Sequence, residues 1–202
     1  GHIREEGELN AMLKAPMEKD GGGGQFLSVI ICTHNPRPDH LHRTLQSLQA
    51  QTLHREQWEL LVIDNRSDEP LDGKWDLSWH PHSKHVREER IGLTMARLRG
   101  IEESKGELLL FVDDDNVLCD DYLVRTLEIM DRHPFLGVIG AGRIEAEFEK
   151  EPEPGLKPYL PMLALRSVPG SNWSNDPKDH SVPWGAGMVV RRAIAARYQD
   201  IL

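Results

Sequence analysis

Three adjacent carboxylates, Asp113, Asp114 and Asp115, directly follow the apolar run 108–112. Neighbouring carboxylates repel one another unless solvent or a cation screens them. If the chain stays extended beyond the run, Asp113 and Asp115 point to one side and Asp114 points away. Two hard oxygen ligands on one side suit Mg²⁺ or Mn²⁺, which complete their shells with water and phosphate oxygens. We therefore predict a divalent metal site at Asp115 and Asp113.

The triplet has two other interpretations. In open coil, three acids are typical of a solvated turn, here one that would cap a helix beginning near Asp121. The apolar run before the triplet favours the metal site over this turn, because a buried strand presents its last residues to a cleft. A calcium loop of the EF-hand type is excluded, since Leu118 occupies the sixth position, where a glycine is needed.

Polar residues also end two earlier apolar runs. Thr33, His34 and Asn35 follow the run 27–32, and Asp64-Asn65 ends the run 59–64. In a parallel sheet, ligands bind beyond the carboxyl ends of the strands, so we expect these clusters to share one site with the acidic triplet. The first run is not followed by a glycine-rich dinucleotide fingerprint, and the chain has no Gly-Lys-Ser/Thr phosphate loop.

The elements that would position these residues follow from the alternation of apolar runs with amphipathic segments. Strands are expected at 27–32, 59–64, near Val86, and at 108–112, 137–142 and 188–190. Helices are expected from an N-cap at Asp39 to residue 48, at 94–104 before Gly106, and at 122–131. This rhythm predicts an α/β fold with a mixed, mostly parallel sheet flanked by helices. Seven prolines favour an irregular segment at 143–183, with a lid at 171–183.

Composition bounds the class of protein. The 202 residues suit one domain, and a net charge of −9 argues against non-specific nucleic-acid binding. No apolar run has the length of a membrane span, and the distant Cys32 and Cys119 indicate neither a disulfide framework nor a zinc ribbon. We expect a reduced, cytoplasmic domain at 25–202, preceded at 1–24 by an extension or tag with a glycine linker.

Two further groups could carry chemistry. His80, His82 and His85 have metal-like spacing, but no cysteine or acidic partner is evident, so we predict surface histidines. The basic residues between positions 87 and 99 are interleaved with acids, which predicts a solvated face. These basic residues are Arg87, Arg90, Arg97 and Arg99.

The segments LQSLQAQT, LLVIDNRSDE, IGLTMARLRGIEESKGELLLFVDDDN and WGAGM occur in an order that resembles family 2 glycosyltransferases of the GT-A fold. The resemblance covers roughly residues 27–192. It implies a Rossmann-like sheet with a nucleotide-binding half at 25–118 and a partial acceptor half at 119–202. It also implies metal-dependent transfer of a sugar, with inversion, from a nucleoside-diphosphate donor, usually linked to UDP. The acceptor would be a hydroxyl of a glycan, a lipid-linked sugar or a small molecule, handled in the cytoplasm or at the inner face of a membrane.

The resemblance also implies roles for individual residues. Nucleotide binding falls to Thr33, His34, Asn35, Asp64, Arg97, Asp113 and Asp114, the metal to Asp115 with Asp113, and the donor sugar and acceptor to Trp184, Gly185, Ala186 and Gly187. His34 departs from the tyrosine that is more common at its position. For Arg97 a helix-surface arginine is the alternative, and for 184–187 a tight turn.

The family's catalytic base, an acidic pair, follows the WGAGM segment. Asp200 is the only acid after Asp179, and we do not assign it, so the base is expected beyond Leu202. Two alternative functions stay open. One is a catalytically incomplete nucleotide-binding or scaffold domain, and the other is a sugar-phosphate nucleotidyltransferase, which would need a glycine-rich first loop that 33–38 does not supply.

Overall fold

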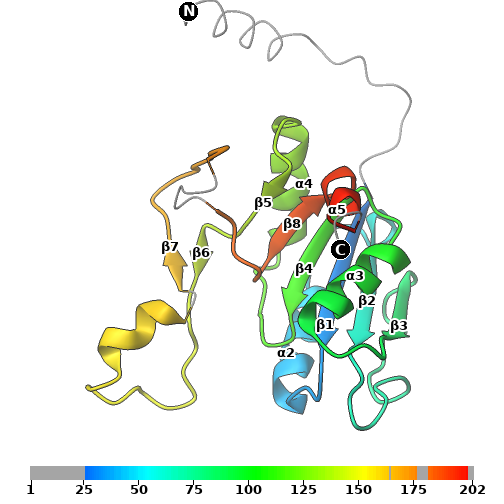
Figure 1. The fold of residues 1–202 in the computed structure, drawn as a ribbon, viewed down its shortest axis with the longest axis horizontal. Coiled ribbons are helices and arrows are strands. Elements are labelled where there is room, and N and C mark those ends of the chain that lie inside the picture. The colour runs from blue at the N-terminus through cyan, green and yellow to red at the C-terminus, as the bar shows by residue number, and fades with distance from the viewer. Residues whose placement is uncertain (1–25, 164, 177–181, 200–202) are drawn as a thin grey trace, which may run out of the picture.

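The structure is a computed structural model that describes residues 26–163, 165–176 and 182–199. The predicted N-terminal extension, Asp200 and part of the predicted lid at 171–183 lie outside the described residues. One sheet dominates the fold, with strand order β3-β2-β1-β4-β8-β5 (Figure 1). Its strands are β1 (Leu27–Thr33), β2 (Trp58–Asp64), β3 (Ser83–Arg87), β4 (Leu108–Asp113), β8 (Met188–Arg191) and β5 (Val138–Ile139).

The sheet is mixed and mostly parallel, as predicted. Strands β3, β2, β1 and β4 run parallel, and β8 is antiparallel to both β4 and β5. The pairing places Thr33 opposite Asp64 and Cys32 opposite Asp113. The carboxyl ends of the three central strands therefore lie side by side.

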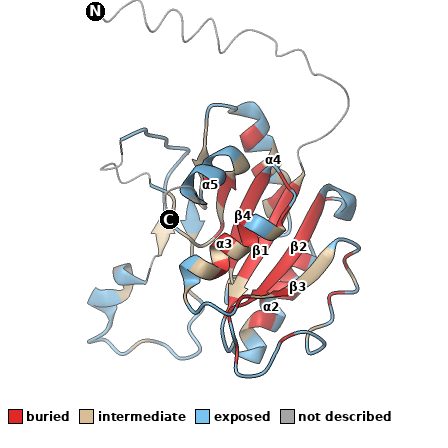
Figure 2. Ribbon diagram, turned by 45° about the vertical axis from the view of Figure 1, so that its right-hand side comes forward, coloured by how far each residue is buried: buried red, intermediate tan, exposed pale blue. Residues whose placement is uncertain are grey.

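Helices cover both faces of the sheet, which explains why its central strands read as continuous apolar runs. On one face α2 (Pro38–Gln49) and α4 (Tyr122–Arg132) pack on Leu27, Val29 and Ile31. On the other face α3 (Leu93–Glu103) and α5 (Arg192–Gln199) pack on Ile30 and its neighbours. Figure 2 shows the buried residues concentrated in the central strands. No helix of the described part of the chain has the length and apolar character needed to cross a bilayer.

Two predicted helix boundaries differ in the structure. Helix α2 begins at Pro38, with Arg37 before it, so Asp39 lies in the first turn rather than at the cap. Proline suits this first position because its fixed φ is helical and its missing N–H needs no partner. Helix α3 ends at Glu103, with Ser104 as its C-cap, and Gly106 serves close packing instead, since a Cβ there would lie 2.6 Å from Ser28 Oγ.

The segment 143–183 is less irregular than predicted, and the strand predicted at 137–142 is shorter. Only Val138–Ile139 pairs within the main sheet. Strands β6 (Arg143–Ile144) and β7 (Arg166–Ser167) pair with each other, and a 3₁₀ helix, η2 (Lys157–Met162), lies between them. Together they form an arm, residues 143–167, that stands away from the main sheet (Figure 1).

The histidine cluster is only partly the surface group that we predicted, because His82 is exposed and His85 half-buried, whereas His80 is buried. His80 is 2% exposed, and its ring packs edge-on against Trp58 with 4.0 Å between centroids. His82 pairs with Glu56, which lies within the short helix η1 (Arg55–Gln57), with 2.8 Å between Nε2 and Oε2. Burial, together with the nearby His82 and Arg55, lowers the pKa of His80 to about 4. His80 is therefore a neutral core residue.

This burial predicts a pH-dependent stability. Because the pKa of His80 is lower in the folded than in the unfolded chain, its stabilisation is complete above about pH 6.5 and is lost as the pH falls towards 4. We expect the free energy of unfolding of His80→Asn to fall by about 2 kcal/mol less than that of the wild type over this pH range. Urea unfolding at several pH values measures it, with the exposed His42→Gln as control; equal pH slopes in wild type and His80→Asn would contradict the assignment.

Candidate functional site

The three polar clusters predicted at the strand ends meet at one edge of the sheet. The Thr33 hydroxyl donates to Asp114 Oδ2, which joins the end of β1 to the acidic triplet. The Asn65 N–H donates to the Thr33 carbonyl at 2.8 Å, which joins β1 to β2. The prediction of a shared site edge is confirmed.

The orientation predicted for the acidic triplet is wrong. Strand β4 ends at Asp113, and the next residues turn, closed by a hydrogen bond from the Asn116 N–H to the Asp113 carbonyl at 3.1 Å. Asp114, predicted to point away, therefore contacts Thr33, because side-chain alternation holds only while the chain stays extended. Asp115 is exposed, and its Oδ1 accepts from Asn116 Nδ2 at 3.0 Å.

The triplet carries negative charge that the protein only partly compensates. Burial raises the pKa of Asp113, the Arg97 guanidinium lowers it, and Asp115 and Asp114 raise it again, with a net rise. Arg97 Nη2 lies 3.8 Å from Asp113 Oδ1, outside ordinary hydrogen-bond distance. A hard cation would relieve this repulsion, so the carboxylate donor set fits Mg²⁺ or Mn²⁺.

A different trio brings its ligand atoms closer together. Within the described ranges, Asp39, His40 and Glu149 are the one group of three such side chains whose ligand atoms all lie within 4.8 Å of one another. Arg37 already bonds both carboxylates, at 3.0 Å to Asp39 and 2.6 Å to Glu149. An internal guanidinium therefore supplies the positive charge that a metal would bring.

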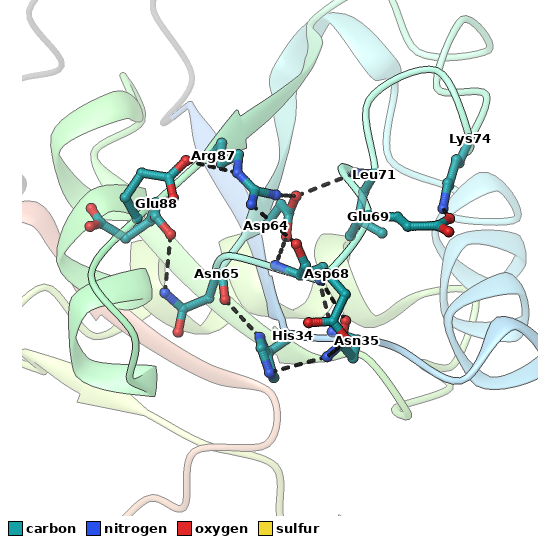
Figure 3. A network of polar contacts seen from close by, with 12 residues as sticks. His34, Asn35, Asp64, Asn65, Asp68, Glu69, Leu71, Lys74, Arg87 and Glu88 are labelled. Atoms are coloured by element: carbon teal, nitrogen blue, oxygen red, sulfur yellow. Dashed lines mark hydrogen bonds and ion pairs between the residues drawn. The ribbon is translucent and has the colours of Figure 1, made fainter.

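Asp64 holds together the loop that follows β2 (Figure 3). It is 3% exposed, and its carboxylate accepts from the N–H groups of Ser67 at 2.8 Å and Leu71 at 3.3 Å. Arg87 Nη1 donates to the same carboxylate at 2.7 Å. Burial raises the pKa of Asp64, but these hydrogen bonds outweigh burial and lower it. Contact of Asp64 with the base of a nucleotide stays a prediction, and such a contact would compete with these hydrogen bonds.

His34 and Asn35 are exposed, and both form hydrogen bonds with the loop after β2 (Figure 3). His34 Nδ1 lies 2.8 Å from the Asn65 carbonyl, which can only accept, so Nδ1 donates, and Nε2 lies 3.3 Å from the amide donor Asn35 Nδ2 and accepts from it. Asn35 has a positive φ of 49°, and its side-chain amide bonds Asp68 in both directions. The loop after β1 therefore presents a fixed imidazole tautomer at the site edge.

Asn65 was expected at the shared edge of the sheet, but no role of its own was predicted for it. Its Nδ2 donates to the carbonyls of Glu88 at 3.4 Å and Arg90 at 2.7 Å, and its Oδ1 accepts from the Gly92 N–H at 2.8 Å. Glu88 is 5% exposed, and hydrogen bonds from Arg90 lower its pKa to about 2. Asn65 thereby anchors the segment that leads into α3.

Helix α3 carries Arg97 into the site. Its guanidinium lies 5.6 Å from the Phe111 ring centroid, and a Cβ on Gly185 would lie 2.7 Å from its Nη2. Arg97 thus lies between β4 and the WGAGM segment. It is neither part of a solvated face, as we predicted, nor the helix-surface arginine that was the alternative. Arg87 also departs from the solvated face, because it binds the buried Asp64.

The predicted donor-sugar segment borders a cleft of about 380 Å³. The cleft lies between the triplet, α4 and the arm, and its lining includes Asp115, Tyr122, Ile144, Ala186 and Gly187. Trp184 is 37% exposed, and the Arg166 guanidinium lies over its ring at 5.2 Å. The structure thus brings Ala186 and Gly187 together with Asp115 across one cleft.

A sequence model of the family described as Glycosyl transferase family 2 matches residues 28–198. The chain belongs to this family. The match covers the sheet, the site edge and the cleft, and it confirms the resemblance carried by the ordered motifs.

Curated relatives of this family 2 glycosyltransferase chain match only part of it. Glycosyltransferase AglE of Haloferax volcanii is 30% identical over 93 residues, which are 45% of this chain and 30% of AglE. Poly(ribitol-phosphate) beta-N-acetylglucosaminyltransferase TarP of Staphylococcus aureus is 30% identical over 95 residues, which are 46% of this chain and 29% of TarP. The aligned part spans less than a third of either relative.

Solved structures share the fold. TarS 1-349 of S. aureus matches with a TM-score of 0.64 at 20% identity, over 86% of this chain and 49% of TarS 1-349. Mannosyltransferase PcManGT of Pyrobaculum calidifontis matches with a TM-score of 0.61 at 17% identity, over 97% of this chain and 53% of PcManGT. These matches confirm the predicted GT-A architecture of the family 2 chain.

The Asp64 contacts generate a prediction for this family 2 chain. Asp64→Asn replaces an acceptor-only carboxylate with an amide that faces three donors, so we expect a loss of about 2 kcal/mol in the free energy of unfolding. Asp68→Asn, at an exposed position of the same loop, is the control and should change stability little. Denaturant unfolding measures both, and equal stabilities of the two variants would contradict the role given to Asp64.

Proposed function

We propose that this chain binds the donor in a metal-dependent, inverting glycosyltransferase that moves a sugar from a nucleoside diphosphate, UDP in the first instance, to a hydroxyl acceptor. One observation carries the proposal. The ends of β1, β2 and β4 converge at a site edge that adjoins a cleft, and an incompletely neutralised acidic turn separates the two. A donor has a matching layout, with nucleoside at one end, sugar at the other and phosphates between them.

The nucleoside end of the proposal rests on the loops after β1 and β2. His34 Nε2 already accepts from Asn35 Nδ2 at 3.3 Å, and Asn35 is held against Asp68, so the loop after β1 is preorganised and a nucleoside would share or replace these hydrogen bonds. Thr33 is 4% exposed and fixes Asp114. In this proposal Thr33 and Asp64 act chiefly by shaping these loops.

The phosphate end rests on charge. Asp115 with Asp113 would hold Mn²⁺ or Mg²⁺, and a cation there would neutralise the charge that grows on the leaving nucleotide. Arg97 provides a guanidinium beside the same turn, fixed by Phe111 and Gly185, and would bind phosphate oxygens. TarS has been crystallised with UDP and with UDP-GlcNAc, and PcManGT with GDP-Man and Mn²⁺, which makes these the first probes for this chain.

The sugar end and the acceptor rest on the cleft. The backbone of 185–187 would approach the transferred sugar, and Trp184 would provide an apolar face beside it. Glu145 and Glu147 line the cleft, but they pair with Arg143 and Arg43, so we assign neither as the base. The proposal places no catalytic base among the described residues, and the acceptor is a glycan, lipid-linked or small-molecule hydroxyl.

Calorimetry with UDP in the presence and absence of Mn²⁺ tests the metal. We expect Mn²⁺ to strengthen UDP binding, and Asp115→Ala to weaken it by about tenfold, or about 1.4 kcal/mol, because the bridging charge is lost. Asp131→Ala, at an exposed position on α4, is the matched control. Metal-independent UDP binding that survives Asp115→Ala would favour a nucleotide-binding scaffold, and the lack of any nucleotide binding would contradict the proposal.

Arg97→Ala tests the phosphate contact separately. We expect UDP to bind about tenfold more weakly to this variant, with little change for uridine, because only the phosphates lose a partner. Arg125→Ala removes an exposed arginine of α4 and should leave UDP binding unchanged. A proportional loss for UDP and uridine would place Arg97 at the nucleoside instead.

A further inference from the structure

The segment Gly185–Gly187 is held from two sides by residues that are distant in the sequence. Arg97 lies against Gly185 on one side. On the other side Tyr122, the first residue of α4, donates its hydroxyl to the Gly187 carbonyl at 2.6 Å. No role was predicted for Tyr122 from the sequence, although Tyr122 lines the same cleft as Asp115 and Ala186.

The conformation of Gly187 explains why this contact is specific. Its φ is +71°, a region in which side chains are strained, and its N–H donates to the Phe111 carbonyl at 3.1 Å. A Cβ on Gly187 would lie 2.6 Å from the Tyr122 hydroxyl oxygen. Both backbone polar groups of Gly187 are therefore bonded, and its hydrogen atom fills the space in which any side chain would clash.

We propose that Tyr122 is a positioning residue that fixes the backbone of Gly185–Gly187 at the cleft and thereby sets the affinity for the sugar part of the donor. This inference rests on the proposed function, which places the donor sugar at this segment. It goes further because it states that one part of the protein recognises the sugar and another part recognises the nucleotide.

The chemistry of Tyr122 favours positioning over proton transfer. Its hydroxyl proton is committed to the Gly187 carbonyl, and burial raises the pKa of Tyr122 to about 12. The phenol therefore stays protonated near neutral pH and keeps donating to Gly187. The hydrogen bond of Tyr122 runs to the turn that enters β8, on the far side of β4 from β1 and β2 (Figure 1).

Tyr122→Phe keeps the ring and removes the hydroxyl, so it tests the role cleanly. We compare the Kd of UDP with the Kd values of UDP-GlcNAc, UDP-glucose and UDP-glucuronic acid, all with Mn²⁺. We expect UDP to bind within about twofold of wild type, and the best wild-type UDP-sugar to lose about fivefold relative to UDP. Tyr198→Phe, at an exposed tyrosine of α5, is the control and should leave this ratio unchanged.

Hydrogen–deuterium exchange without ligand provides a readout independent of donor binding. Tyr122→Phe should speed exchange of the Gly187 amide, while exchange in β1 and β2 stays as in wild type. An unchanged ratio of UDP-sugar to UDP affinity in Tyr122→Phe would overturn the positioning role, and so would an equal loss for UDP and UDP-sugars. Wild-type protein that binds neither UDP nor a UDP-sugar would contradict the proposed function itself, and the role of Tyr122 would fall with it.

Discussion

The in-register parallel pairing of β1 with β2 on one side and β4 on the other is the constraint on which the site depends. These strands are buried on both faces, so polar side chains can gather where the strands end. Because Thr33 lies opposite Asp64 and Cys32 opposite Asp113, three separate stretches of sequence reach one edge together. The loops, α3 and the cleft are arranged around that edge.

Charge is distributed unevenly over the site, and the pattern has a functional sense. The acids that shape the loops are paired inside the protein, Asp64 with Arg87 and Glu88 with Arg90. The acids of the turn after β4 are not paired so closely, since Arg97 stays 3.8 Å from Asp113 and Asp115 is exposed. These two loop carboxylates are thus neutralised by arginines, whereas the turn after β4 keeps negative charge that a divalent cation would neutralise under the proposed function.

The strands and the shared site edge could be predicted from sequence, because long apolar runs that end in polar residues are local features. Contacts between distant segments could not be predicted, and they shape the site most: Arg97 against Gly185 is one example. The orientation of Asp114 was predicted wrongly because alternation stops where the strand stops. His80 was predicted to be exposed because neither its burial nor its aromatic neighbours can be read from local spacing.

The proposed function depends on where a divalent cation binds in relation to the nucleotide. Paramagnetic broadening by Mn²⁺, followed by NMR on isotope-labelled protein with and without UDP, locates that cation directly. We expect broadening centred on the amides of 113–116 and 185–187, and we expect UDP to strengthen this broadening. Broadening centred on the trio Asp39, His40 and Glu149, or broadening that does not respond to UDP, would contradict it.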